Sequence, residues 1–419
     1  YTPDTIPSIT LQELKEMRGL PYPDVAFKIA WKYLYEELPE DDLKSIIEGA
    51  YDFTAPLTHV HNRTYLMRLD QGPTAAFKDF AAQMMSRLMQ YYLKKMGRDM
   101  LVLTATSGDT GSAVAHAFHG LENIRAVVLY PKEEVTDRQR KLMTTLGGNV
   151  TAVAVDGKFD DCQLLAKTAF MDQELEELNL SSANSINFGR LMPQMIYYFH
   201  AYVNLYRVAG EKIVFSVPSG NFGDLMGGLM AKRMGLPVEK FIAATNDNDA
   251  FPRFLDSGDY NPISPSRACI SNAMNVGHPS NLARLVHLYG GYMDEKGVLH
   301  EKPDMNALRD DIYSIAVSDG ETRQAIKEAY QRYEIILEPH GAVGWHALHK
   351  YMGEEGRPDL FSVLLETADP AKFPEEVLEA INVDPRIPDS MRNILDKPES
   401  FESMPNDYQS LKKLLLEIQ

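Results

Sequence analysis

The sequence predicts an α/β protein with two lobes, each built on an open, mostly parallel sheet covered by helices, and with a helical N-terminal region. Two observations support this prediction. Short apolar runs alternate along the chain with longer amphipathic segments, which is the pattern of strand–helix–strand units. The apolar runs also show little inside–outside alternation, as in parallel strands that are buried on both faces.

The predicted elements follow one another in a regular order. We expect the first seventy residues to be helical, because apolar residues recur at helical spacing over 24–36 and Pro39 opens a second helix. A long amphipathic helix is expected over 79–96, ended by Gly97. Strands are predicted at residues 100–105, 125–130, 150–155, 213–217, 241–245 and 361–365. Helices are predicted to end near residue 118 and to cover 136–146, 189–206 and 222–234.

These elements suggest three regions. We predict a mainly helical N-terminal region (1–78), a smaller α/β lobe (79–200), and a larger α/β lobe that carries a polar, helical C-terminal extension (201–419). Because the chain begins with Tyr1 rather than Met, we also expect a segment to precede it.

Composition narrows the class of protein. The 419 residues carry a net charge of −17, which disfavours nucleic acids and anionic membranes as partners. No apolar run approaches the roughly 18 residues of a membrane helix, and no signal-peptide pattern is present. Two cysteines cannot form a disulfide framework, so a reduced, cytoplasmic setting is expected. The histidines lack metal-site spacing, and we predict no metal.

The first candidate for chemistry is Lys78, which stands between Phe77 and Phe80 at the start of a predicted helix. Partial burial by the two aromatic rings would lower the pKa of the amine and leave it nucleophilic. Such an amine forms Schiff bases with carbonyl cofactors. The alternative is a lysine whose stem covers core aromatics while its ammonium group stays in water.

A second candidate is the segment Ser219-Gly220-Asn221-Phe222-Gly223, which follows a predicted strand and opens a helix. Its glycines allow close backbone approach, and successive N–H groups at a helix N-terminus can bind a phosphate without a basic patch. It matches neither the Walker A nor the dinucleotide-binding pattern. The alternative is a simple strand-to-helix turn.

Three further segments are polar at points where an open sheet binds ligands. The loop after the strand at 100–105 offers hydroxyls and a carboxylate for a polar small molecule, or caps its helix. The segment 184–190 gathers amide, hydroxyl and guanidinium groups that suit a phosphate or carboxylate. Thr367, after the last predicted strand, offers a hydroxyl for a ring nitrogen, or caps a turn. The residues of the first two segments are Thr106, Ser107, Asp109 and Thr110, and then Ser185, Asn187 and Arg190.

Together these segments resemble the threonine synthase family, pyridoxal-phosphate enzymes of the tryptophan-synthase-β type, fold type II. The resemblance extends from about residue 50 to 375 and depends on separate motifs in the expected order. These are GPTAAFKDF, TATSGDTGSAVAHAF, LYPKEEVTDRQRKLMTTLGGNV, NSINFGR, SVPSGNFGD, AATNDND and LETADPAKF.

The resemblance implies a role for each segment. Lys78 would carry pyridoxal 5'-phosphate through a Schiff base, the 219–223 loop would hold its phosphate, and Thr367 would face the pyridine nitrogen. A neutral hydroxyl there should leave that nitrogen unprotonated. Asp109 would lie beside the phenolic oxygen, where many proteins of this fold carry Asn, and a carboxylate in that place needs a shared proton. The 106–110 and 185–190 segments would bind substrate.

The implied activity is that of a carbon–oxygen lyase in amino-acid biosynthesis, which converts O-phospho-L-homoserine and water to L-threonine and phosphate. Lys78 would remove the Cα proton and shuttle it during γ-elimination and β-addition of water. We expect a cytoplasmic monomer or homodimer with a small-molecule substrate, and lobe closure during the reaction. Two alternatives remain, namely a phospho-lyase or dehydratase that releases a 2-oxo acid, and a non-catalytic ligand-binding protein on the same fold.

Overall fold

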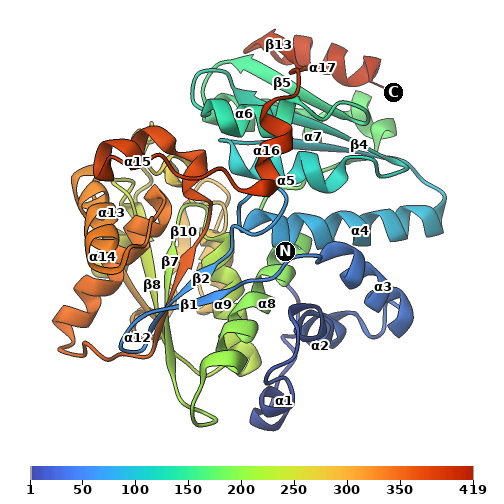
Figure 1. Cartoon of the computed structure of the whole chain (residues 1–419). Coiled ribbons are helices and arrows are strands. Elements are labelled where there is room, and N and C mark those ends of the chain that lie inside the picture. Colours follow the sequence, from blue (N-terminus) through green and yellow to red (C-terminus); the bar gives the residue numbers. More distant parts are fainter. Residues whose placement is uncertain (1, 419) are drawn as a thin grey trace.

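The larger of two main sheets lies in the lower lobe of Figure 1, in a computed structural model that describes residues 2–418. Its six strands run in the order β1-β2-β12-β7-β8-β11, with only the β1–β2 pair antiparallel. In that order they are β1 (Leu57–His61), β2 (Thr64–Arg68), β12 (Ser362–Glu366), β7 (Ile213–Pro218), β8 (Val238–Thr245) and β11 (Ile312–Ala316).

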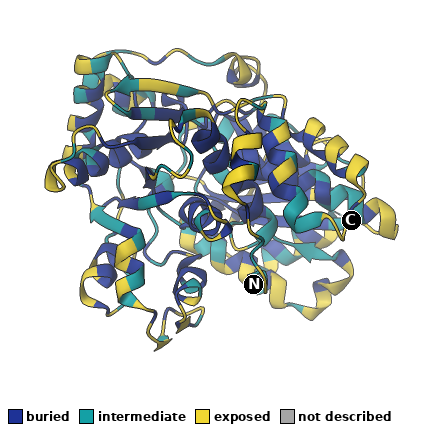
Figure 2. Ribbon diagram, turned by 90° about the horizontal axis from the view of Figure 1, so that it is seen from below, coloured by how far each residue is buried: buried dark blue, intermediate teal, exposed yellow. Residues whose placement is uncertain are grey.

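Helices cover this sheet on both faces, as buried parallel strands require. On one face α13 and α14 enclose an apolar cluster with the strands, and on the other α8 and α9 form the largest cluster of the molecule together with the N-terminal helices. The bounds are α8 (Phe188–Leu205), α9 (Gly223–Met234), α13 (Asp319–Tyr333) and α14 (Pro339–Glu354). Figure 2 shows buried residues along the strands and the inner sides of the helices.

The smaller sheet is entirely parallel, in the order β13-β5-β4-β3-β6. One face packs against α4, α5 and α6, and the other against α7 and α17. The strands are β3 (Met100–Ala105), β4 (Ile124–Pro131), β5 (Val150–Asp156), β6 (Leu180–Ser181) and β13 (Glu402–Pro405). The helices are α4 (Lys78–Met96), α5 (Asp109–Phe118), α6 (Asp137–Thr144), α7 (Phe159–Met171) and α17 (Tyr408–Glu417).

The remaining elements join or flank the two lobes. N-terminal helices α1 (Leu11–Glu16), α2 (Tyr22–Leu34) and α3 (Glu40–Ala50) pack against α8 and α4. The others are η1 (Gln173–Leu178), α10 (Ala250–Ser257), η2 (Asn272–Met274), α11 (Leu282–Leu288), β9 (Tyr292–Met293), β10 (Leu299–Glu301), α12 (Met305–Asp311), η3 (Pro370–Lys372), α15 (Pro374–Ile381) and α16 (Asp389–Leu395). Among the helices of residues 2–418, none combines the length and apolar content needed to cross a membrane.

The predicted two-lobed α/β class is confirmed, and each predicted strand lies within a few residues of an observed one. Gly97 ends α4 in the left-handed conformation (φ 62°), as expected. The expectation of a wholly helical start was wrong, because residues 57–68 form the β1–β2 hairpin. Thr58, Val60 and Thr64 are β-branched, and Asn62 adopts a positive φ at the turn, which is a hairpin pattern.

The C-terminal segment also differs from the prediction of a helical extension on the larger lobe. It adds strand β13 beside β5 in the smaller sheet, and α17 packs against α7, as the red ribbon at the top of Figure 1 shows. Leu411 and Leu415 are fully buried at helical spacing in this contact. The apolar spacing is visible in the sequence, but the lobe that it covers is set by the tertiary fold.

We expect Leu415→Ala to destabilise the protein by about 2–5 kcal/mol, because it leaves a cavity between α17 and the smaller sheet. The neighbouring Leu416 is 42% exposed, so Leu416→Ala should change stability by no more than about 0.5 kcal/mol. Urea unfolding followed by circular dichroism measures both. Equal effects of the two substitutions would contradict the packing of α17 described here.

Candidate active site

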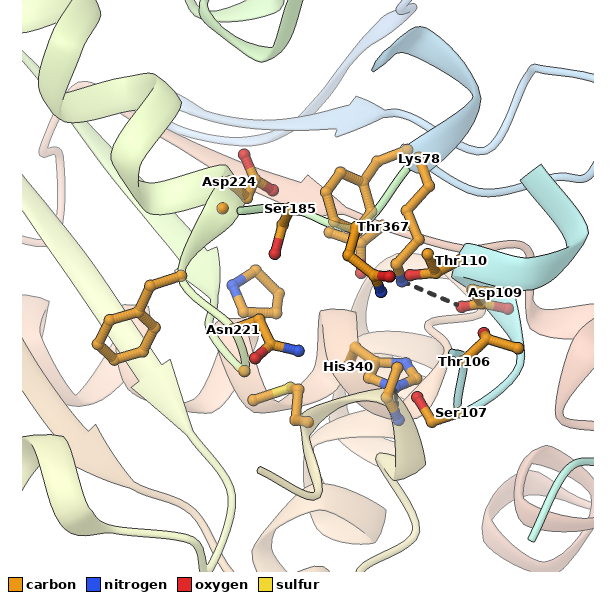
Figure 3. Close-up of a pocket in the computed structure, with 18 of the residues that line it drawn as sticks. Lys78, Thr106, Ser107, Asp109, Thr110, Ser185, Asn221, Asp224, His340 and Thr367 are labelled. Carbon is orange, nitrogen blue, oxygen red and sulfur yellow. Dashed lines mark hydrogen bonds and ion pairs between the residues drawn. The ribbon is translucent and has the colours of Figure 1, made fainter. Parts of the chain in front are cut away.

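The candidate active site is a pocket between the two sheets, at the carboxyl ends of their strands. Pro218 ends β7, Ala105 ends β3, and Thr367 directly follows β12; all three line the pocket. Parallel sheets bind ligands at this edge, where the loops and helix N-termini converge. Figure 3 shows Lys78, Asp109 and Thr367 facing the same space from three different segments.

Lys78 is positioned by a backbone pairing that continues beyond the strands. β2 and β12 are parallel neighbours, and the loops that follow them stay in contact. The Phe77 N–H donates to the Thr367 carbonyl at 2.9 Å, and the Asp369 N–H donates to the Ala75 carbonyl at 3.0 Å. Lys78 and Thr367 therefore share one small region although 289 residues separate them in the sequence.

The Lys78 side chain is mostly buried, with 14% of it exposed. Its Nζ lies 3.8 Å from Asp109 Oδ2 and 4.8 Å from the centre of the Phe77 ring. Burial lowers the pKa of Lys78, although the Asp109 carboxylate opposes that shift. Phe80 is fully buried among Tyr22, Tyr51, Phe53 and Tyr197 and takes no part in the pocket.

The loop before α9 has the features of a phosphate site. The hydrogen bonds within residues 2–418 provide no protein acceptor for the backbone N–H groups of Gly220, Asn221, Phe222 and Gly223, which all line the pocket at the start of the helix. Phe222 adopts a positive φ of 61° and packs on Phe251. A Cβ at Gly220 would lie 3.0 Å from the Ala273 carbonyl oxygen. Unpaired N–H groups at a helix N-terminus fit the phosphate of pyridoxal 5'-phosphate.

Asp109 forms a buried ion pair that the sequence did not indicate. Its Oδ1 lies 2.5 Å from Nζ of Lys372, a fully buried lysine that also donates to the Thr74 carbonyl at 3.0 Å. Gln139 Nε2 donates to the same carboxylate at 3.0 Å. Burial alone would raise the pKa of Asp109, but Lys372 and Lys78 more than offset it and hold that pKa well below its usual range. Asp109 is therefore held as an ionised carboxylate by its two lysine neighbours.

Four predicted substrate residues lie at the pocket beside these groups, namely Thr106, Ser107, Thr110 and Ser185. The Thr106 hydroxyl accepts hydrogen bonds from the N–H groups of Gly108 and Gly111 and so shapes its own loop. The Ser185 hydroxyl lies 3.2 Å from that of Ser280.

Arg190 also lines the pocket, 2% exposed, with Nη1 donating to the Ala183 carbonyl and Nε unpaired. Burial lowers the pKa of Arg190 to about 10, so the guanidinium remains charged at neutral pH. A buried cation with an unused donor suits an anionic group.

Two predicted residues are not brought to the pocket lining. Asn187 caps α8, where its side chain accepts from the Gly189 N–H and donates to the Ser182 carbonyl. Ser219 is buried behind the phosphate loop and donates to the Val217 carbonyl at 2.8 Å. Both side chains hydrogen-bond to nearby backbone and so shape their loops. Residue type alone does not distinguish this role from ligand binding.

The structure adds residues that sequence reasoning missed. Asp224, the second residue of α9, lines the pocket, with Oδ1 accepting from the hydroxyls of Tyr197 and Tyr198 and Oδ2 unpaired. Burial raises the pKa of Asp224 to about 6. His340, from the first turn of α14, also lines the pocket. Asp224 and His340 lie in the first turns of α9 and α14. The sequence indicates both helix starts, but only the fold shows that they meet at one pocket.

Comparison with known proteins identifies the family. Residues 54–365 match the model of pyridoxal-phosphate dependent enzymes, residues 1–51 the threonine synthase N terminus, and residues 341–415 the threonine synthase C-terminal model. The chain is 39% identical to threonine synthase of Escherichia coli K12 and 40% identical to that of Serratia marcescens. Each alignment covers 99% of this chain and 92% of the relative.

A solved structure gives the same result. The pyridoxal-phosphate-bound threonine synthase of Brucella melitensis superposes with a TM-score of 0.91 at 33% identity, over 100% of this chain and 93% of that one. The pocket of this chain has the residues that such a cofactor requires, namely a buried amine, a loop of unpaired N–H groups and a facing hydroxyl. The chain belongs to the threonine synthase family of pyridoxal-phosphate-dependent enzymes.

Proposed function

We propose that the pocket around Lys78 converts O-phospho-L-homoserine and water to L-threonine and phosphate. The observation that carries this proposal is the convergence of one buried amine, one loop of unpaired N–H groups and one buried guanidinium on a single space. The first two fit a phosphorylated aldehyde cofactor, and the guanidinium fits a second anionic group, such as the phosphate of the substrate.

Lys78 would hold the cofactor covalently and would move protons during the reaction. The bound cofactor supplies an electron sink for the carbanion formed when a substrate C–H bond is broken. The lowered pKa of the Lys78 amine favours its neutral form, which accepts a proton from Cα. The same amine lies 3.8 Å from the Asp109 carboxylate, which orients it toward the pocket. The backbone N–H groups of Gly220, Asn221, Phe222 and Gly223 hold the cofactor phosphate.

The substrate lies on the side of the pocket formed by the smaller lobe. Ser107 and Thr110, at the start of α5, bind the substrate carboxylate, since hydroxyls and N–H groups at a helix N-terminus attract anions. Arg190 and Ser185 bind the phosphate that leaves Cγ. Water then adds at Cβ, so that one C–O bond is broken and another is formed, and Lys78 returns the protons.

Asp109 remains ionised through Lys372 and lies beside the anchoring lysine. We propose that this carboxylate accepts a hydrogen bond from the phenolic hydroxyl of the cofactor. The ionised Asp109 would thus act as an acceptor at a position where many proteins of this fold carry a neutral Asn.

We propose a cytoplasmic enzyme that acts as a monomer or homodimer and does not bind nucleic acid, given the net charge of −17. Its two cysteines are free, and burial raises the pKa of Cys162 to about 12 and that of Cys269 to about 11, so neither thiol is activated.

Product analysis tests the proposed reaction. With O-phospho-L-homoserine, the purified enzyme should release threonine and phosphate in equal amounts, measured by amino-acid chromatography and a phosphate assay. Phosphate accompanied by 2-oxobutanoate would instead indicate the phospho-lyase alternative. Absence of any product from a protein that binds the cofactor would favour the non-catalytic alternative.

We expect Lys78→Ala to abolish turnover and the cofactor absorbance that depends on a covalent link, because Lys78 is the one lysine that lines the pocket within residues 2–418. Borohydride reduction of the unmodified enzyme, followed by mass spectrometry, should find the cofactor adduct on Lys78. Lys95→Ala, at the exposed end of the same helix, is the matched control and should keep both properties. Full activity of Lys78→Ala would refute the assignment.

We expect Lys372→Met to destabilise the protein by about 3–5 kcal/mol, because it leaves the buried Asp109 carboxylate without its closest cation. Adding Asp109→Asn should recover most of that loss, as urea unfolding of the three variants would show. Since the pKa of Asp109 is lower in the folded protein than in the unfolded chain, the pair stabilises at neutral pH and the stabilisation is lost as the pH falls. Additive effects of the two substitutions would contradict the pairing.

A further inference from the structure

A buried glutamine of the smaller lobe contacts the carboxylate that lies beside Lys78. Gln139 stands in the first turn of α6 and is fully buried. Its Nε2 donates to Asp109 Oδ1 at 3.0 Å, and the same oxygen is paired with Lys372. The other oxygen, Oδ2, lies 3.8 Å from Lys78 Nζ, as the dashed line in Figure 3 marks. The two partners of Oδ1 therefore leave Oδ2 for the pocket.

The Gln139 amide has one orientation that its neighbours favour. Its Oε1 accepts from the Thr136 N–H at 3.1 Å, at the N-terminus of α6, and from Asn272 Nδ2 at 3.3 Å. Turning the amide over would place its oxygen against the ionised Asp109 and its N–H groups against two donors. The amide oxygen thus meets two donors, and the amide nitrogen is directed at the carboxylate.

The turn that carries Asp109 is shaped around this amide. Gly108, the residue before it, has a φ of 133°, and a Cβ at Gly108 would lie 2.6 Å from Gln139 Cδ. The Ser112 hydroxyl, one turn further along α5, donates to the Gln139 carbonyl at 3.3 Å. The start of α5 is therefore in close contact with Gln139 through both side chain and backbone.

Asn272 brings the larger lobe into the same contact. It is the first residue of η2, which follows β8 in the larger lobe, whereas α6 packs on the smaller sheet. The next residue, Ala273, lines the pocket, and its carbonyl oxygen would lie 3.0 Å from a Cβ at Gly220. The hydrogen bond from Asn272 to Gln139 therefore joins the segment beside the phosphate loop to the smaller lobe.

We propose that Gln139 is a positioning residue, which holds the Asp109 carboxylate with Oδ2 toward Lys78 and, through Asn272, ties that geometry to the relative placement of the two lobes. The proposal rests on the proposed function, in which Lys78 carries the cofactor and Asp109 contacts it. Without the amide the carboxylate can turn, because the terminal torsion of an Asp side chain is broad. Lys372 alone does not prevent this, since an ammonium group is a point charge that attracts either oxygen.

The test exchanges the amide for an acid. In Gln139→Glu the introduced carboxyl group still accepts from Thr136 and Asn272, so the helix cap and the contact between the lobes are kept. Because this group and Asp109 lie beside a single buried lysine, one of the two keeps a proton up to a raised pKa. Below that pKa the introduced group donates to Asp109 as the amide does, and above it the two anions repel each other.

Two readouts are followed in the holoenzyme as the pH rises. The absorbance of the bound cofactor reports the charge beside its link to Lys78, and kcat reports the positioning of the reacting groups. Gln139→Glu should match the wild type at acid pH. At higher pH it should show an additional absorbance transition, with kcat lower by about 10- to 100-fold and KM little changed. Gln173→Glu adds the same charge at an exposed position of the smaller lobe and should follow the wild type throughout.

Asn272→Ala tests the contact between the lobes and serves if Gln139→Glu does not fold. It removes one neutral hydrogen bond to the amide, so it should lower kcat by about 3- to 10-fold and change the absorbance titration. Where both variants fold, Asn272→Ala should add no further loss to Gln139→Glu at high pH, because both act on the same carboxylate.

Three results would overturn this inference while leaving the proposed function intact. They are wild-type behaviour of Gln139→Glu at every pH, a defect of Gln139→Glu that is the same at every pH, and wild-type kcat and absorbance of Asn272→Ala. A wild-type holoenzyme that forms no threonine refutes the proposed function instead, and the absorbance titration then still tests the role of Gln139.

Discussion

The parallel pairing of β2 with β12 is the constraint on which the site depends. The two segments stay together beyond the ends of the strands. Backbone N–H groups of Leu69, Phe77 and Asp369 donate across the following loops to carbonyls of the other segment. These bonds bring Lys78 and Thr367 to the same pocket. Gly72 allows the turn before Lys78, because a Cβ there would lie 2.5 Å from the buried Asp79 side chain. The side-chain chemistry is thus positioned mainly by backbone pairing.

Two buried carboxyl groups, those of Asp109 and Glu338, lie close to this pocket and have different hydrogen-bond and charge partners. Asp109 belongs to the smaller lobe, and the Lys372 that compensates it comes from the η3 turn after β12, so the ion pair also joins the lobes. Glu338 directly precedes α14 and accepts hydrogen bonds from the N–H groups of His340 and Gly341 and from the Thr367 hydroxyl. The first arrangement pairs a carboxylate with a buried lysine at one edge of the pocket, while the second surrounds a carboxyl group with hydrogen-bond donors.

Most strands and the loop before α9 could be predicted from the sequence, because each is encoded in a short stretch of residues. The strands were visible as apolar runs, the end of α4 as Gly97, and the phosphate loop as Gly220 and Gly223 at a helix start. What could not be predicted depended on contacts between distant segments. Lys372 follows an ordinary Pro-Ala turn, and Glu338 precedes an ordinary helix, so neither local pattern shows that the side chain is buried. The expectation that Asn187 faces the substrate illustrates the converse case. A polar residue at a helix start often caps the helix, and the Asn187 side chain caps α8.

The acidic composition fits anion sites that consist of a few local donors instead of a broad basic surface. With a net charge of −17, a phosphate that approaches the molecule meets an unfavourable overall field. The pocket offsets this with groups whose positive character is local: the N–H groups before α9, the start of α5 and the buried guanidinium of Arg190. These donors act at short range in a site of low dielectric, where each hydrogen bond to an anion is stronger than at the surface. Donors placed in a pocket between the lobes suit a small phosphorylated ligand.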